Sequence, residues 1–378
     1  MFIFALFTNK EEIVEQMPAN TFKSNFYILI TLCFLSFFLS QKAFCETEEK
    51  QSVEKEEGFN PGTTIMEHIA DAHEWHIAKV GEKHISIPLP VILYDEGKIV
   101  TFMSSRFHHG EAEYLGYKLD EKGKIIKVDE SAKPPLDFSI TKNVLSLFIG
   151  IFIICLIFIS IARRYQKHRN EAPRGLQSWV EPLILFVRDD IARPSIGEKR
   201  YERYMPFLLT VFFFIFINNL LGLIPFFPGG ANLTGNIAVT MVLAIFTFII
   251  TTVSANKHYW KEIYNAPGVP WWLKFGLPIM PIVEIIGVVV KPFVLMVRLF
   301  ANITAGHIIA LGFISLIFIF GQISTGAGYG ISILSILFYV FMGLLELLVA
   351  FIQAYVFTLL SALYFGMAMA EHHEEAHQ

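Results

Sequence analysis

The stretch VRLFANITAGH, residues 297–307, places a permanent cation in the most apolar part of the chain. Arg298 is followed by residues 299–345, which contain no Lys, Arg, Asp or Glu. A charged side chain is costly in hydrocarbon and usually faces protein or a water-filled cavity. The stretch therefore indicates a membrane helix that carries a functional charge.

The composition is that of an integral membrane protein. Hydrophobic residues make up 54% of the 378 residues and charged residues only 17%. Several apolar runs reach the length of about 20 residues that spans a bilayer. The three cysteines provide no disulfide framework. The sequence shows no nucleotide-binding loop, nucleophile motif or nucleic-acid patch, so we expect neither an enzyme in isolation nor a nucleic-acid partner.

Five apolar segments predict an all-α membrane domain. They cover residues 144–162, 205–226, 236–254, 279–320 and 331–369. The last two are too long for a direct crossing, since 40 helical residues extend about 60 Å and the hydrocarbon core is about 30 Å thick. We therefore expect these two to form a long, steeply tilted helix hairpin around a loop at 321–330, bent or broken at Pro281, Pro292 or nearby glycines.

The residues before the membrane domain divide into two parts. An apolar run at 26–39 follows Lys23 and precedes polar residues, which is typical of a signal peptide over residues 1–45; a retained membrane helix is the alternative. Residues 46–140 are polar and contain two Gly-Lys turns, at 95–98 and 121–124, between alternating segments. This pattern predicts β-hairpins. We expect a small N-terminal region, a membrane domain at 141–370 and a polar tail at 371–378.

Positive charge predicts the orientation. The loops that follow the first and third apolar segments hold Arg163, Arg164, Lys167, Arg169, Arg174, Lys257, Lys261 and Lys274. The loops at 227–235 and 321–330 hold no Lys or Arg. Because positively charged loops stay in the cytoplasm, we expect an extracytoplasmic N-terminal region and a cytoplasmic C-terminus.

The polar side chains of the last two segments are few and regularly spaced: Glu284, Lys291, Arg298, Asn302, His307, Glu346 and Gln353. Spacings of seven and four residues place the first four on one helix stripe, and Glu346 and Gln353 are also seven apart. Folding the segments about residue 326 brings Arg298 level with Gln353. It also brings His307 level with Glu346.

The chemistry of these residues suggests two proton relays with a barrier between them. His and Glu can carry protons, whereas Arg keeps its proton and attracts carboxylates. A continuous relay would dissipate about 2.3 kcal/mol per proton at 100 mV. We interpret His307 with Glu346 as an outer relay, Glu284 as part of an inner one and Arg298 as the barrier. The alternatives are a structural or snorkelling Arg298 and plain packing or interfacial bridges at the other positions.

Two motifs, RLFANITAGH at 298–307 and ELLVAFIQAYVFTLLSALY at 346–364, resemble subunit a of the F-type ATP synthase, the membrane stator of the Fo motor. The resemblance covers about residues 140–370. It implies that Arg298 is the essential residue that faces the ring of c subunits, and that Asn302 and Gln353 match family positions in the same two motifs. Glu284 and Lys291 match family positions upstream, on the cytoplasmic-side half-channel.

The resemblance also implies the role of the chain and its partners. It suggests a non-catalytic, proton-conducting stator in the inner membrane of a bacterium, with two offset half-channels that serve the c ring. The expected partners are the c ring, a b-type peripheral stalk, the rest of the F1Fo complex and the lipid bilayer. No cofactor and no metal are expected. An autonomous channel or transporter, and a scaffold whose charges only fix helix register, are the competing hypotheses; no convincing internal repeat supports a transporter.

Some positions differ within the family. His307 and Glu346 carry the exchanged form of a pair that is Glu and His in some bacterial members, which argues that the two positions touch. Asn219 matches a polar family position, but Gly222 and Phe227 stand where some bacterial members have acidic residues. We expect Asn236 to supply part of the missing polarity. The histidines around HIADAHEWH, residues 68–76, present no closed set of metal ligands and are expected on a solvated or partner-facing surface.

Overall fold

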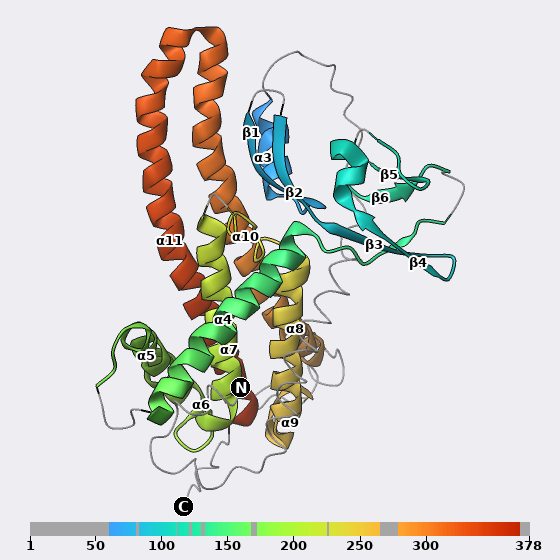
Figure 1. Ribbon diagram of the computed structural model, residues 1–378. Coiled ribbons are helices and arrows are strands. Elements are labelled where there is room, and N and C mark those ends of the chain that lie inside the picture. The colour runs from blue at the N-terminus through green and yellow to red at the C-terminus, as the bar shows by residue number, and fades with distance from the viewer. Residues whose placement is uncertain are drawn as a thin grey trace, which may run out of the picture.

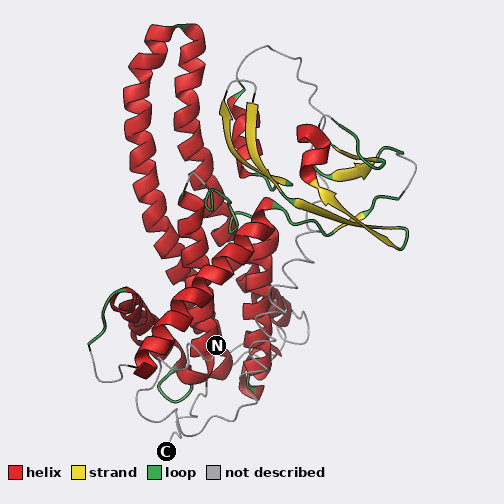
Figure 2. Cartoon of the chain, viewed as in Figure 1, coloured by secondary structure: helices red, strands yellow, loops and turns green. Residues whose placement is uncertain are grey.

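The computed structural model consists of a helical bundle and a smaller β-rich region beside it (Figures 1 and 2). It describes residues 60–80, 83–110, 112–120, 123–129, 133–167, 172–224, 227–264 and 279–370. The predicted signal peptide at 1–45 and the tail at 371–378 lie outside the described residues.

The β-rich region contains short antiparallel strands packed around a small core. Its elements are α3 (Pro61–Ile69), β1 (Glu74–Val80), β2 (Lys83–Pro88), β3 (Pro90–Asp95), β4 (Lys98–Met103), the 3₁₀ helix η1 (Ser104–Gly110), β5 (Tyr117–Leu119), β6 (Ile125–Lys127) and β7 (Leu136–Asp137). β1 pairs with β2 and β5 with β6, and a three-stranded sheet has the order β4-β3-β7. Val91, Leu93 and Phe107 are fully buried at its centre.

The turn between β3 and β4 shows how the local sequence sets this structure. Glu96 and Gly97 both have positive φ, at 48° and 84°. Two consecutive residues with positive φ form the turn that matches the twist of a two-residue hairpin, and Gly takes that conformation without steric cost. Asp95 is therefore paired directly with Lys98 across the turn.

Five helices are long and apolar enough to cross a membrane, the number expected from the sequence. They are α4 (Lys142–Lys167), α7 (Tyr201–Leu223), α8 (Ile237–Ser254), α10 (Ile279–Ile323) and α11 (Thr325–Met369). α7 is the centre of the bundle. In its most apolar 18-residue stretch 56% of the residues are buried, whereas the share is 11% in α10 and in α11. Its buried side chains, such as Leu208, Phe212 and Ile215, form the middle of the main core.

The last two helices are longer and closer in sequence than predicted. α10 and α11 are each unbroken over 45 residues, and Pro292 lies inside α10 without ending it. The expected loop at 321–330 is reduced to Ser324, which caps α11 by accepting a hydrogen bond from the Ala327 N–H at 3.1 Å. A serine cap satisfies a free N–H group of the first turn, so the following glycine-rich residues can be helical.

Short helices connect the spans where the sequence analysis predicted only loops. After α4 the chain forms α5 (Leu176–Phe186), a π-helical segment η2 (Val187–Ala192) and α6 (Arg193–Ile196); α9 (Lys257–Tyr264) follows α8. Trp179 of α5 is 81% exposed, whereas Ile184 and Ile191 are buried in the main core.

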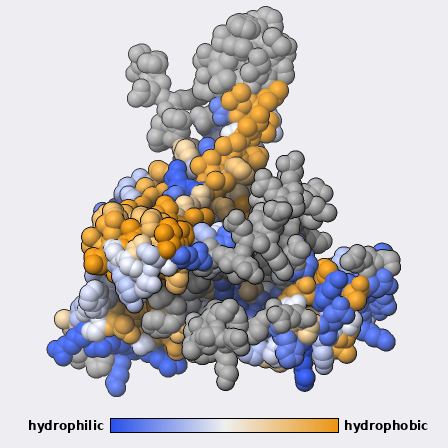
Figure 3. Space-filling view, turned by 90° about the horizontal axis from the view of Figure 1, so that it is seen from above, coloured by the Kyte–Doolittle hydropathy of each residue, from blue (hydrophilic) through white to orange (hydrophobic). Residues whose placement is uncertain are grey.

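In the space-filling view, apolar side chains cover much of the helices and hydrophilic ones gather mainly toward the periphery (Figure 3).

The end of α11 is fixed by polar contacts and by a close approach to α6. The Met369 carbonyl accepts hydrogen bonds from Arg200 Nη1 at 3.0 Å and Asn256 Nδ2 at 2.9 Å. One turn earlier, a Cβ atom on Gly366 would overlap the carbonyl oxygen of Ser195. Glycine at 366 therefore allows α11 to contact the backbone of α6 directly.

We expect Gly366→Ala to destabilise the protein. Overpacking usually costs about 1–3 kcal/mol, which outweighs the gain of about 0.5–1 kcal/mol that Ala brings to a helix interior. The thermal midpoint of the detergent-purified protein should fall. Gly330→Ala, at an exposed position of α11 with open space around it, is the matched control and should not lower the midpoint. Equal midpoints for the two variants would contradict this account of the α6–α11 contact.

Candidate functional site

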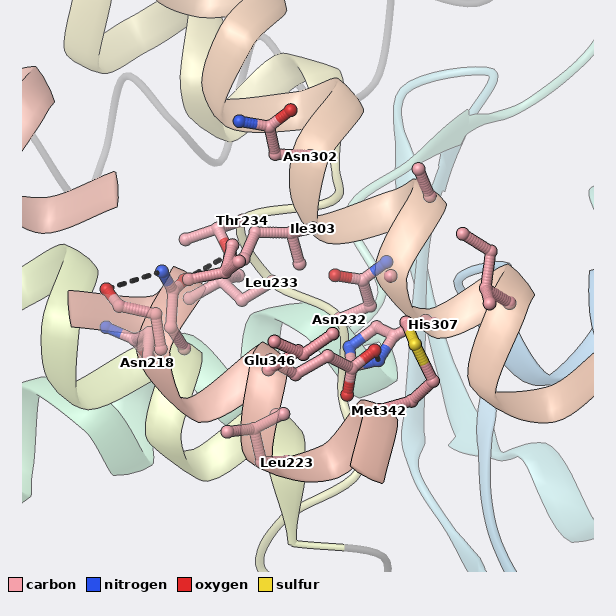
Figure 4. A pocket seen from close by; sticks show the side chains of 18 of the residues that line it. Asn218, Leu223, Asn232, Leu233, Thr234, Asn302, Ile303, His307, Met342 and Glu346 are labelled. Atoms are coloured by element: carbon pink, nitrogen blue, oxygen red, sulfur yellow. Dashed lines mark hydrogen bonds and ion pairs between the residues drawn. The ribbon is translucent and has the colours of Figure 1, made fainter. Parts of the chain in front are cut away.

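A polar cavity lies between α7, α10, α11 and the loop that joins α7 to α8. Its volume is about 280 Å³, enough for several water molecules at about 30 Å³ each. The polar residues that line it are Asn218, Asn219, Asn232, Thr234, Asn302, His307 and Glu346. Figure 4 shows His307 and Glu346 facing one another from α10 and α11, with Asn232 close by.

The expected contact between His307 and Glu346 is present. His307 Nδ1 lies 3.5 Å from Glu346 Oε1, and the two side chains are only 18% and 13% exposed. Glu346 Oε1 is buried and has no hydrogen-bond partner among the described residues. A buried acceptor of this kind is satisfied when water or a proton reaches it. The pair is thus a titratable site inside the bundle.

Gly306 explains how the carboxyl group reaches this position. A Cβ atom at residue 306 would lie 2.9 Å from Glu346 Oε1, closer than real side chains approach. Glycine therefore leaves the space that the carboxyl group occupies against α10. Gly222 of α7 faces the same pair, because a Cβ atom there would lie 3.7 Å from His307 Nε2.

Three asparagines extend the polar surface away from the pair, and they play different parts. Asn219 is buried and has both amide ends engaged: its Nδ2 donates to the Ala350 carbonyl at 3.4 Å and its Oδ1 accepts from Thr234 Oγ1 at 2.5 Å. It ties α7 to α11 and to the loop. Asn218 and Asn232 both line the cavity, and Asn218 Oδ1 and Asn232 Nδ2 are buried without a hydrogen-bond partner among the described residues. Asn218 Oδ1 lies against Gly150 of α4, whereas Asn232 lies close to His307.

Asn236 does not supply cavity polarity as the sequence analysis expected. Its side chain accepts a hydrogen bond from the Ala238 N–H at 3.0 Å and so caps the N-terminus of α8. It is not among the residues that line the cavity. Asn218 and Asn232 line the cavity instead, and neither was predicted from the sequence. Two features of the sequence could have indicated these residues. Asn232 lies in a loop free of Lys and Arg, and Asn218 is adjacent to Asn219, which was predicted.

The residues that face one another across α10 and α11 are those expected from folding the two segments about residue 326. Lys291 Nζ lies 5.9 Å from the ring centroid of Tyr364, and the rings of Phe313 and Phe338 stack at 5.1 Å. These contacts lie on either side of the His307–Glu346 pair and of Arg298. Arg298 is therefore held at the level of Gln353, as expected, because antiparallel helices with equal rise keep one register.

Arg298 and Gln353 lie at one level but differ in burial. The Arg298 side chain is exposed and has no ion pair or hydrogen bond within the part of the chain that the structure describes. Gln353 is 4% exposed. The separation of nine residues between Arg298 and His307 corresponds to about 14 Å along the axis of α10. A guanidinium that is unpaired on an apolar helix face is costly in hydrocarbon and is stabilised by an anionic partner.

The remaining predicted site residues lie on both sides of Arg298. Asn302 is exposed at the edge of the cavity, between Arg298 and His307. Glu284 is half-buried toward the start of α10. Burial, together with the negative charge of Glu284, raises the pKa of the Tyr259 phenol in α9. No ion pair joins Glu284 to Lys291 among the described residues, and Lys291 lies instead over the Tyr364 ring.

The histidines of the N-terminal region form no metal cluster in the described part of the chain. No group of three or more His, Cys, Asp or Glu side chains there is placed to hold an ion. His73 Nε2 lies 3.1 Å from Asp137 Oδ2. Burial would raise the pKa of Asp137, but the hydrogen bond and charge of His73, with hydrogen bonds from Ser139, lower it overall. The side chains of His68 and His76 lie outside the described residues.

The fold and the site together define a class of protein. The structure has five apolar helices long enough to cross a membrane, and three of them, α7, α10 and α11, line a polar cavity that contains the His307–Glu346 pair. Arg298 is exposed on α10 without an ion pair or hydrogen bond among the described residues. α10 and α11 also leave most of their apolar surface uncovered. These features define an integral membrane protein that has ionisable groups inside its bundle and exposes an apolar surface to lipid or a membrane partner along its last two helices.

Comparison with known proteins identifies the family. Residues 144–366 match the family model described as ATP synthase A chain. This match covers more than half of the chain, and the chain belongs to this family. Residues 64–145, which include most of the described β-rich region, match a second model described only as a domain of unknown function.

Curated relatives agree with the family match. The chain is 45% identical over 249 residues to ATP synthase subunit a of Chloroherpeton thalassium, covering 64% of this chain and 70% of the relative. It is 45% identical over 245 residues to that of Chlorobium phaeobacteroides strain BS1, covering 64% and 69%. It is 43% identical over 249 residues to that of Myxococcus xanthus, covering 64% and 77%. These relatives are the non-catalytic membrane subunit, so the chain is a bacterial membrane protein of the proton-translocating part of ATP synthase.

Proposed function

We propose that the chain is the stator that provides two offset proton half-channels to a rotor ring of c subunits. The observation that carries this proposal is the separation of two kinds of site along α10. The His307–Glu346 pair lies inside a polar cavity, and Arg298 lies about 14 Å away on an exposed face without a partner in the described residues. One site exchanges protons, and the other holds a fixed positive charge.

The cavity serves as the outer half-channel in this proposal. Water in the cavity beside Asn232 leads protons to His307 and Glu346, which pass them to a carboxyl group on the ring. Asn302, at the edge of the cavity nearest Arg298, lies where the proton leaves α10. Asn219 positions α7 against α11 and keeps the cavity in shape.

Arg298 separates this route from the inner half-channel. A guanidinium keeps its proton, so it cannot relay one. It lowers the pKa of a carboxyl group that the ring brings beside it and forces release of the proton to the other side. Glu284 and Lys291, on the opposite side of Arg298, line the inner half-channel. Gln353 is buried at the same level on α11 and keeps the groups around Arg298 in position.

The orientation and partners follow from this arrangement. The N-terminal region faces the extracytoplasmic side of the bacterial inner membrane after removal of a signal peptide over residues 1–45, and the C-terminus is cytoplasmic. The exposed apolar faces of the tilted α10–α11 hairpin contact the c ring. A b-type peripheral stalk holds the subunit still and connects it to the rest of the F1Fo complex.

Glu346→Gln tests the proposal because it removes the titratable group and keeps its shape. We expect passive proton conduction through vesicles stripped of F1 to fall at least about tenfold, equivalent to about 1.4 kcal/mol in the rate-limiting barrier. Conduction is measured per assembled complex under an imposed potential. Glu202→Gln, an exposed position at the start of α7, is the control and should conduct normally. Normal conduction by an assembled Glu346→Gln complex would refute the proposed outer half-channel.

A further inference from the structure

Helix α3 of the N-terminal region borders the titratable pair. Ile69, its last residue, lines a second cavity of about 60 Å³ together with His307 and Glu346. α3 packs against α10, beside the upper part of that helix in Figure 1. Ile69 is half-buried, whereas Met66, one turn earlier, is 62% exposed. The helix therefore presents Ile69 to the cavity and Met66 to the outside.

The chain that leaves α3 is fastened to the start of the first membrane helix. Asp71 Oδ2 accepts a hydrogen bond from Thr141 Oγ1 at 2.8 Å, and Asp71 Oδ1 accepts one from the Asn143 N–H at 3.0 Å. The Ala72 carbonyl accepts a third from the Lys142 N–H at 2.8 Å. These bonds satisfy N–H groups in the first turn of α4. They also fix the position of Ile69, which lies two residues before Asp71.

A second contact joins the N-terminal region to the loop that lines the main cavity. Trp75 of β1 is 3% exposed and meets the ring of Phe227 edge-on, with the centroids 5.3 Å apart. Phe227 belongs to the loop between α7 and α8, which also supplies Asn232 to both cavities. The N-terminal region is thus attached on two sides of the cavities that contain His307 and Glu346.

We infer that the last turn of α3 forms the outer wall of the proton route, with Ile69 as the residue of that wall nearest the titratable pair. This inference rests on the proposed function, because it names a further part of the same half-channel. An isoleucine offers protons no site, so it confines the route to the polar side, where Asn232 leads to His307 and Glu346. The N-terminal region then sets access to the pair and is part of the conducting machinery.

Charge placed at residue 69 tests the inference. A fixed charge beside a narrow polar route changes the local concentration of the ion that enters it. We expect Ile69→Glu to conduct protons faster than Ile69→Lys by at least about threefold at equal levels of assembled complex. The measurement is passive proton conduction through vesicles stripped of F1, under a potential that drives protons from the extracytoplasmic side. Met66→Glu and Met66→Lys are the matched controls and should conduct alike, since solvent screens an exposed charge.

A second measurement starts from a complex that is already folded. In a background with Cys33, Cys45 and Cys155 replaced by Ala, Ile69→Cys is assembled and then treated from the extracytoplasmic side with anionic or cationic methanethiosulfonate reagents. We expect the two adducts to differ in proton conduction, and the same adducts on Met66→Cys not to. Equal conduction by the charge variants and by the modified complexes, or a thiol at residue 69 that no reagent reaches, would overturn the inference.

Glu346→Gln, measured in the same vesicles, separates this inference from the proposed function. If Glu346→Gln blocks conduction while the variants at residue 69 conduct alike, only the outer wall is refuted. If Glu346→Gln conducts normally, the half-channel itself is refuted, whatever the variants at residue 69 show.

Discussion

Replacing Arg298 with Ala is expected to abolish proton-driven ATP synthesis and to open a proton leak. Arg298 is exposed on α10 and has no ion pair or hydrogen bond among the described residues, so its charge is available to the rotor. In the proposed mechanism, loss of Arg298 lets a protonated carboxyl group on the ring pass between the half-channels without releasing its proton. Synthesis should be lost, because each proton that leaks dissipates about 2.3 kcal/mol per 100 mV without driving the motor.

Synthesis and passive leak are to be recorded in the same membrane vesicles, with the amount of assembled complex measured separately. Arg163→Ala, at an exposed position near the end of α4, removes an equal charge away from the site and should change neither quantity. Arg298→Lys retains the positive charge but can lose its proton and lacks the planar fork. We expect it to impair synthesis with less leak than Arg298→Ala. Unchanged synthesis and leak in an assembled Arg298→Ala complex would mean that the arginine is structural.

The sequence was most informative where one physical rule governs many residues. α10 and α11 have the same rise per residue, so the position of the turn between them determines which residues face one another. A turn assumed near residue 326 was therefore enough to pair His307 with Glu346. The extent of the turn was predicted wrongly, because a loop was expected over 321–330 and the helices continue to Ile323 and from Thr325. Ser324 caps α11 there, and the glycines at 326, 328 and 330 continue the helix.

The sequence was less informative about groups whose role depends on three-dimensional packing. Asn218, Asn219, Asn232 and Asn236 have the same side chain, yet their surroundings differ. Asn218 and Asn232 line the cavity and each has one unpartnered buried atom, Asn219 links α7 to α11 and to the loop, and Asn236 caps α8. Nothing in the chemistry of an isolated asparagine separates these roles. The position of α3 was also beyond sequence reasoning, because it depends on Asp71 reaching Thr141 and Asn143, about 70 residues along the chain.

Exchanging the titratable pair, His307→Glu with Glu346→His, is expected to restore most of the conduction that each single change removes. His307→Glu places two carboxyl groups side by side, and like charges raise the pKa of one of them. Glu346→His leaves two imidazoles without a carboxyl partner. Each single variant should lose at least about tenfold in proton conduction, or about 1.4 kcal/mol. The double variant again pairs one acid with one base and should return to within about threefold of the original rate.

The geometry makes the exchange a strict test of contact and of role. Gly306 leaves the space in which the side chain of residue 346 lies against α10, so an imidazole can enter from α11. Recovery by the double variant requires that the two positions interact, because independent sites would give additive losses. If the pair were only a packing bridge, the single changes would reduce the amount of assembled subunit and leave conduction per assembled complex unchanged. A loss per complex, reversed by the exchange, is the result that a proton relay at His307 and Glu346 requires.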